Sequence, residues 1–239
     1  NPDADTIGTG LGIYAWLKEQ GKRVEISSFS TDLPKSVQFL PYFDKIKHKI
    51  DFNDSLIVAC DAGSMDRLGF DLSARDIINI DHHKTNTRFG ILNIVDDTAV
   101  SSSEIAFYLL KSLGKISSKT ATAFYAALAS DSRNFTTSNM KKDTFKLADN
   151  LVGLGADAVY ISREMINNRS LASLRILGLS LGNMILKEDA KIAVMPITKE
   201  QIKQTGAVYS DLDGIVDYAK SLVTVDIGIM ILDRGDDIK

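Results

Sequence analysis

Short apolar runs and longer stretches with helical spacing follow one another along the chain. The runs at 56–60, 77–80 and 92–95 are typical of strands that are buried on both faces of a parallel sheet. Weaker patterns predict strands at 24–29 and 46–50. Helical spacing of apolar residues predicts helices at about 9–20, 101–113, 118–130, 143–154, from 157, and at 170–186. The pattern therefore predicts an α/β protein with a mostly parallel sheet flanked by helices.

The pattern changes after residue 186. Two strands are predicted at 190–196 and 222–232, with short helices at 199–204 and 211–219 between them. We therefore expect a first domain at 1–186, which ends in a connecting helix, and a smaller α/β domain at 187–239.

Two of the predicted strands end in polar residues. The run at 56–60 is followed by Asp61, and the run at 77–80 is followed by Asp81, His82 and His83. In an open α/β sheet the ligand site lies outside the carboxyl ends of the strands. These residues are therefore expected on one rim of the sheet.

Three more aspartates stand at the ends of predicted helices. Asp3 and Asp5 belong to a polar turn at 1–8, where they could also be capping acids that favour the helix dipole. Asp131 follows an alanine-rich helix, and the helix dipole disfavours a carboxylate there. The compensating positive charge could come from Arg133 or from a metal ion.

Composition narrows the class of protein. The chain has 239 residues, a formal net charge of -3 and 44% hydrophobic residues, so it has no general basic field for nucleic acid or for an anionic membrane. The single cysteine, Cys60, excludes an internal disulfide and suits a reducing compartment. No apolar stretch approaches the roughly 18 residues that a membrane span needs. A cytoplasmic protein that holds its substrate locally is expected.

Several familiar sites are absent from the sequence. It contains neither a His-Glu-x-x-His helix nor a Walker phosphate loop, and Gly8 to Gly12 form a poor dinucleotide fingerprint. Cys60 lies inside an apolar run, which argues against a nucleophile. A mixed set of carboxylates and imidazoles suits Mn²⁺ or Mg²⁺. Four aspartates around two ions are the usual arrangement for attack at phosphorus, so a two-metal site is predicted.

The four polar segments together resemble the motifs of the DHH phosphoesterase family. They are the segment 1–8 (NPDADTIG), Asp61 after a strand, the triplet Asp81-His82-His83, and Asp131 after an alanine-rich helix. The order and spacing cover residues 1 to about 186. The stretch 130–135 (SDSRNF), continuing to Thr144 and Phe145, resembles the nanoRNase, or oligoribonuclease, branch. The segment from Ala190 is similar to the start of that family's DHHA1 substrate-binding domain.

The resemblance implies a role for each site residue. Asp3 would bind the first metal, Asp5 the second, and Asp61 would bridge them. His82 and Asp131 would complete the second site, with Mn²⁺ preferred. Asp81 would orient the histidines, and His83 would face the scissile phosphate. Arg133 is the candidate contact to the substrate.

The resemblance also implies a reaction and its substrates. A metal-bridged hydroxide would hydrolyse short RNA or DNA oligonucleotides to mononucleotides, or would remove phosphate from 3′,5′-bisphosphate nucleosides such as pAp. Cleavage of cyclic di-AMP or its linear product is an alternative, as is a pyrophosphatase of similar motif order. A non-catalytic nucleotide-binding module is an alternative of another class. The resemblance also admits a homodimer.

Two parts of the family pattern are expected outside the residues given. The first motif of the family begins with a metal-binding histidine two positions before Asn1. The DHHA1 domain carries a glycine-rich, histidine-containing loop after the last residue, Lys239. The second domain is therefore expected to be incomplete.

Overall fold

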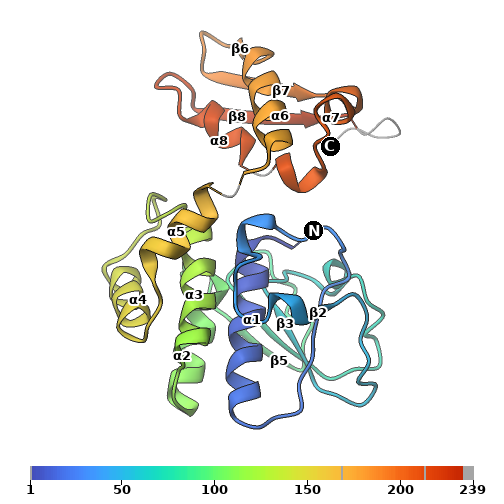
Figure 1. Ribbon diagram of the computed structural model, residues 1–239, viewed down its shortest axis with the longest axis vertical. Helices are drawn as coiled ribbons and strands as arrows, with labels where there is room; N and C mark the ends of the chain where they lie inside the picture. Colours follow the sequence, from blue (N-terminus) through green and yellow to red (C-terminus); the bar gives the residue numbers. More distant parts are fainter. Residues whose placement is uncertain (1, 168, 213, 234–239) are drawn as a thin grey trace. The chain divides into compact units, whose positions relative to one another are not determined.

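The chain folds into two compact units, Asn1–Asn168 and Arg169–Lys239, each with its own sheet and hydrophobic core (Figure 1). The computed structural model describes residues 2–167, 169–212 and 214–233. The hydrophobic pattern predicts a boundary near residue 186, after the helix at 170–186. That helix, α6 (Leu171–Gly182), instead packs Ile176 and Leu177 into the core of the second unit, so the division lies at its start.

The first unit is built on a parallel sheet in the order β3-β4-β5. These strands are β3 (Ile57–Cys60), β4 (Ile77–Asp81) and β5 (Leu92–Val95), which confirms the three apolar runs as strands. The register pairs Cys60 with Ile80, and Ile80 with Ile94, so the carboxyl ends of the strands lie side by side. The weaker strands shorten to β1 (Ile26–Ser27) and β2 (Ile46–Lys47), which form a separate parallel pair.

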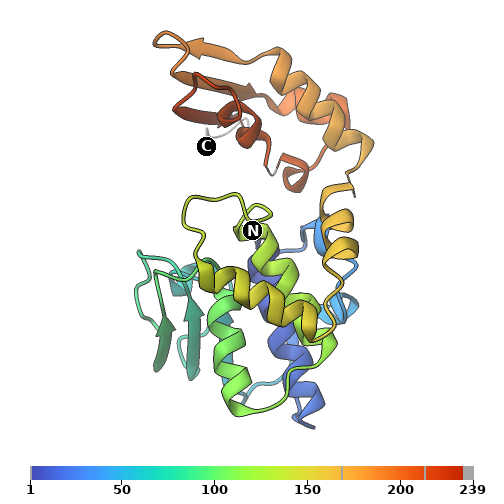
Figure 2. The ribbon, with the colours of Figure 1, turned by 90° about the vertical axis from the view of Figure 1, so that its left-hand side faces the viewer.

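Helices pack on one side of this sheet (Figure 2). Val58 and Ile80 face them, whereas Ala59 and Ile77 face a smaller cluster that is completed by loop residues such as Leu72. The helices of the unit are α1 (Ala4–Glu19), α2 (Ser102–Leu113), α3 (Ser118–Asp131), α4 (Lys142–Gly153) and α5 (Ala158–Asn167), with 3-10 turns at Lys35–Val37, Phe43–Lys45 and Met65–Leu68. The parallel sheet flanked by helices is therefore confirmed.

Helix α1 begins earlier than the sequence pattern predicts. The sequence pattern predicts a turn at 1–8, but the helix starts at Ala4. Asp3 is its N-cap, and Asp3 Oδ1 accepts a hydrogen bond of 2.9 Å from the Thr6 amide. Asp5 consequently lies in the first helical turn.

Glycines let α1 approach α3 closely. A Cβ at Gly8 would lie 2.8 Å from the carbonyl oxygen of Ala123 and 2.9 Å from Cβ of Ala127. A Cβ at Gly12 would lie 2.3 Å from the ring of Phe124. Only glycine fits at either position without movement of α3. The glycines that make a poor dinucleotide fingerprint therefore serve helix packing, and they bring the start of α1 next to α3.

The second unit is a small mixed sheet in the order β6-β7-β8. Its elements are β6 (Ile185–Lys187), β7 (Ile192–Ile197), β8 (Ile227–Leu232), α6, α7 (Lys199–Thr205), α8 (Ile215–Lys220) and the 3-10 turn Tyr209–Leu212. Strand β7 is antiparallel to β6 and parallel to β8. The predicted strands and short helices are confirmed, but β6 was missed. All of its residues are exposed, so the strand carries no pattern of buried positions.

The helix contact gives a first prediction. Gly8→Ala should lower the free energy of unfolding by about 1–3 kcal/mol, because the new methyl group meets a backbone oxygen that cannot rotate away. Gly10→Ala is the matched control, since the nearest atom to its Cβ lies 3.4 Å away in a flexible side chain. That variant should be neutral or gain up to about 1 kcal/mol from helix propensity. Equal effects in thermal or denaturant unfolding would contradict the close contact.

Candidate metal centre

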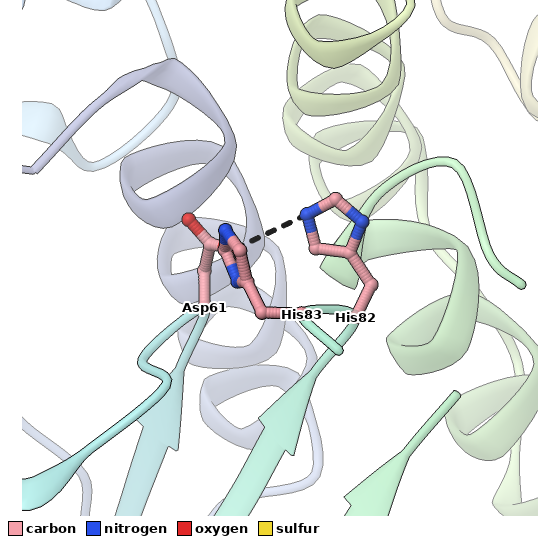
Figure 3. A group of neighbouring side chains, drawn as sticks. All are labelled: Asp61, His82 and His83. Atoms are coloured by element: carbon pink, nitrogen blue, oxygen red, sulfur yellow. Dashed lines mark ion pairs between the residues drawn. The ribbon is translucent and has the colours of Figure 1, made fainter. Parts of the chain in front are cut away.

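The carboxyl edge of the β3-β4-β5 sheet gathers the polar residues that follow its strands. Figure 3 shows Asp61, His82 and His83 together at the ends of β3 and β4. The amide of Asp61 still bonds to the carbonyl of Ile80, at 2.9 Å, and its left-handed φ of 57° then turns the chain. Aspartate tolerates this conformation better than most residues. The expected rim of polar side chains is present.

The N-terminus of α1 adds Asp5 to this edge. Asp5 is completely buried. Its Oδ1 accepts a hydrogen bond of 3.0 Å from Thr9 Oγ1, and its Oδ2 accepts one of 2.8 Å from the amide of Ser102. Each carboxylate oxygen therefore has one donor and retains acceptor capacity for another group.

Asp61 is held in the same way. Its Oδ2 accepts a hydrogen bond of 2.8 Å from Thr6 Oγ1, and its Oδ1 accepts one of 3.0 Å from Ser102 Oγ. The Thr6 hydroxyl also lies 3.0 Å from Asp3 Oδ1. Asp3 is therefore close to Asp61, on the exposed rim of the centre.

His82 lies between the carboxylates. Its Nε2 is 3.2 Å from Asp131 Oδ2, 3.6 Å from Asp61 Oδ1 and 3.9 Å from Asp5 Oδ2. This nitrogen is buried and has no hydrogen bond of acceptable geometry. Its Nδ1 lies 3.4 Å from the carbonyl oxygen of Ala99, which suits Nδ1 as the donor and leaves Nε2 as the nitrogen that a metal ion could bind. A buried imidazole nitrogen without a hydrogen bond, among carboxylates, fits a metal site.

Two overlapping groups of side chains have the spacing of metal ligands. They are Asp5, His82 and Asp131, and Asp61, His82 and His83. Within each group the ligand atoms lie within 4.8 Å of one another. The carboxylate and imidazole donors suit a first-row divalent cation.

The ring of His83 is held by Asp81. Its Nδ1 lies 2.7 Å from Asp81 Oδ1, and Asn86 Nδ2 donates to Asp81 Oδ2 at 2.5 Å. Asp81 is completely buried, whereas the side chain of His83 is 40% exposed. Asp81 therefore orients a histidine whose ring is open to solvent.

The electrostatics of the centre favour a cation. Burial, followed by the charges of Asp61 and Asp131, raises the pKa of Asp5 well above its usual range. Burial, followed by the charge of Asp3, raises the pKa of Asp61 to about 7. For His82, burial lowers the pKa, but the neighbouring carboxylates outweigh it and raise the pKa to about 9. A divalent ion would reverse these shifts by keeping the carboxylates charged and the imidazole neutral.

Arg133 stands on a strained turn two residues after Asp131. Arg133, Asn134 and Phe135 all have left-handed backbone angles, with φ values of 47°, 54° and 65°. Such strain is costly for residues other than glycine and persists only where surrounding contacts impose it. The Ser132 hydroxyl supplies one such contact, because it accepts a hydrogen bond of 3.0 Å from the Phe135 amide. A substrate contact by Arg133 stays a prediction.

The third histidine and the cysteine have no evident role in the candidate metal centre. The third histidine, His48, is exposed and bonds through Nδ1 to the carbonyl oxygen of Ser28. Burial raises the pKa of the Cys60 thiol to about 12, so the thiolate needed for nucleophilic attack is scarce.

Four residues that hydrogen-bond to Asp5, Asp61 or Asp81 were not singled out from the sequence. They are Thr6, Thr9, Asn86 and Ser102. Thr9 was discoverable, because it lies one helical turn after Asp5. Ser102 lies 97 residues from Asp5, so no local pattern could indicate that contact.

The fold and the site together define an α/β protein with aspartate and histidine side chains, spaced to hold a metal ion, at the carboxyl edge of a parallel sheet. Residues 1–129 match the DHH family, N-terminal domain. The chain belongs to the DHH phosphoesterase family. None of the described helices has the length and apolar character to cross a membrane.

Curated relatives match at low identity. The chain is 28% identical over 181 residues to the bifunctional oligoribonuclease and PAP phosphatase NrnA of Thermus thermophilus, a match that covers 74% of this chain and 55% of the relative. It is 25% identical to the protein of the same name from Bacillus subtilis, over 100% of this chain and 77% of the relative. The chain thus spans about half of the first relative's length.

Solved structures share the fold. An exopolyphosphatase-related protein from Bacteroides fragilis is 25% identical, with a TM-score of 0.89, over 99% of this chain and 74% of that chain. A putative family II inorganic pyrophosphatase from Methanococcus jannaschii, at 14% identity, has a TM-score of 0.58 over 97% of this chain and 80% of that chain. The second likeness concerns the fold alone.

Compared with the natural protein, Asp61→Asn should have a higher melting temperature without metal and should gain less stability from added metal. Asparagine accepts the left-handed backbone, and the Thr6 and Ser102 hydroxyls can rotate to suit an amide. Because the pKa of Asp61 is raised to about 7, its charge destabilises the metal-free protein above pH 7 and not below about pH 4. In EDTA at pH 8 the variant should therefore have a higher melting temperature, by about 2–4 °C for each kcal/mol added to the free energy of unfolding. This gain should be smaller at pH 5.

Saturating Mn²⁺ should stabilise the natural protein more than Asp61→Asn, because ligand binding to the folded state adds about 2.7 kcal/mol at a hundredfold excess over Kd. Asp44→Asn is the control, since Asp44 is an exposed aspartate paired with Lys45. A lower melting temperature for Asp61→Asn in EDTA at pH 8, or equal stabilisation by Mn²⁺, would contradict the metal centre.

Proposed function

We propose that this protein is a two-metal phosphoesterase that hydrolyses short oligoribonucleotides to mononucleotides and removes phosphate from pAp. The observation that carries the proposal is the unbonded Nε2 of His82 among the carboxylates of Asp5, Asp61 and Asp131. The names of the two NrnA relatives support the choice of substrates.

The proposed ligand roles are those that the family resemblance implies, and the spacing of Asp5, His82 and Asp131 supports the first of them. Asp5, His82 and Asp131 would hold one cation, and Asp61 would bridge it to a second cation near Asp3. When bound, the two cations would lower the pKa of a water molecule and offset negative charge on the phosphate. Mn²⁺ is preferred in this proposal, because imidazole and carboxylate ligands both suit it.

Other residues of the chain would act on the substrate. Asp81 accepts from His83 Nδ1, so the other ring nitrogen of His83 is free to face a phosphate oxygen. Asn86 fixes Asp81 from the opposite side and thereby fixes the ring of His83. Arg133, an exposed residue two positions after Asp131, would offer a cation to the same phosphate or to its neighbour.

A substrate panel tests the proposal. With Mn²⁺, the protein should release phosphate from pAp and mononucleotide from a dinucleotide RNA, faster than it acts on cyclic di-AMP or inorganic pyrophosphate. Asp61→Asn should abolish turnover, and Asp44→Asn should not. Faster hydrolysis of cyclic di-AMP or pyrophosphate would replace the proposed substrates, and binding of pAp without turnover would indicate a nucleotide-binding module.

Substitution of His82 should lower metal affinity, whereas substitution of His83 should lower kcat. An asparagine amide can imitate Nδ1 of histidine, so His82→Asn and His83→Asn retain the contacts to Ala99 and Asp81 and remove Nε2. His82→Asn should weaken Mn²⁺ binding by about 100-fold or more, because it removes a ligand and not merely a residue that supports one. His83→Asn should bind Mn²⁺ normally but lose about 10²–10⁴-fold in kcat. Mn²⁺ titration and kinetics separate the two, and equal loss of metal in both variants would refute the division of roles.

A further inference from the structure

Ser102, the first residue of α2, contacts two of the proposed ligands at once. Its backbone amide donates to Asp5 Oδ2 at 2.8 Å, and its Oγ donates to Asp61 Oδ1 at 3.0 Å. The residue is completely buried. Asp5 comes from α1 and Asp61 from the end of β3, so one residue of a third element joins them.

These two bonds restrict the distance between the carboxylates. The amide nitrogen and Oγ of one serine are separated by only two carbon atoms, so the two acceptor oxygens must remain near each other. Both carboxylates are buried, and like charges repel each other strongly where water is excluded, so a link between them opposes their separation. The N-terminal end of α2 also brings partial positive charge to the pair.

The two neighbouring serines, Ser101 and Ser103, make no contact of this kind to Asp5 or Asp61 among the hydrogen bonds of the described residues. Ser101 is the N-cap, and its Oγ accepts from the Glu104 amide. Ser103 Oγ lies 2.6 Å from Ser101 Oγ, and both residues are buried like Ser102. Three consecutive buried serines thus separate into two that close the helix end and one that contacts the ligands.

We propose that Ser102 is a positioning residue that sets the spacing of Asp5 and Asp61 and so determines metal affinity. The inference rests on the proposed function for its cations, but it concerns residues of this chain that touch no substrate. Loss of the hydroxyl in Ser102→Ala removes the bond to Asp61 and leaves the backbone bond to Asp5.

The test compares Ser102→Ala with Ser103→Ala. Mn²⁺ titration of the metal-free protein should give an affinity about 10–100-fold weaker for Ser102→Ala, the usual effect of removing a residue that supports a ligand. Ser103→Ala should bind Mn²⁺ as the natural protein does. The Mn²⁺ concentration for half-maximal hydrolysis of pAp should rise in Ser102→Ala by the same factor as its Kd.

Two results would overturn the proposal. One is unchanged Mn²⁺ affinity in Ser102→Ala. The other is equal weakening in Ser103→Ala together with equal loss of metal-free stability, which would indicate a role in the helix end alone. The titration needs no substrate. Normal Mn²⁺ binding by the natural protein without hydrolysis of any tested substrate would therefore refute the proposed function and not the role of Ser102.

Discussion

The structure of the first unit depends on holding like charges together in a buried place. Asp5 is fully buried, Asp61 nearly so, and Asp131 reaches the same histidine nitrogen. Carboxylates this close repel one another strongly where water is excluded. The sheet edge, the early start of α1 and the close approach of α1 to α3 all bring them together. The fold therefore accepts an electrostatic cost that a bound cation would relieve.

The parts of this arrangement that are local in the chain were predictable. The runs that became β3 and β4 are mostly apolar, and each ends at the residues that face the centre. The shared carboxyl edge of parallel strands then places Asp61 beside His82 and His83. The α/β class and the principal ligand candidates follow from these patterns alone.

The remaining parts depend on contacts between distant residues. The start of α1 was placed too late because its first turn contains the polar residues Asp5 and Thr6, although the capping role considered for Asp3 is present. The reason for Gly12 is the ring of Phe124, more than a hundred residues away. The division between the units was misplaced because α6 is apolar enough to suit either core, and only its packing decides which one it joins.

The donors around the two central carboxylates explain why the site is suited to a cation. Asp5 and Asp61 accept their hydrogen bonds from threonine and serine hydroxyls and from one backbone amide, all of them neutral groups. Neutral donors fix the direction of a carboxylate but leave its charge in place, whereas an arginine in the same position would cancel that charge. The two carboxylates are thus oriented while their charge stays available, which is the arrangement that the proposed divalent cations require.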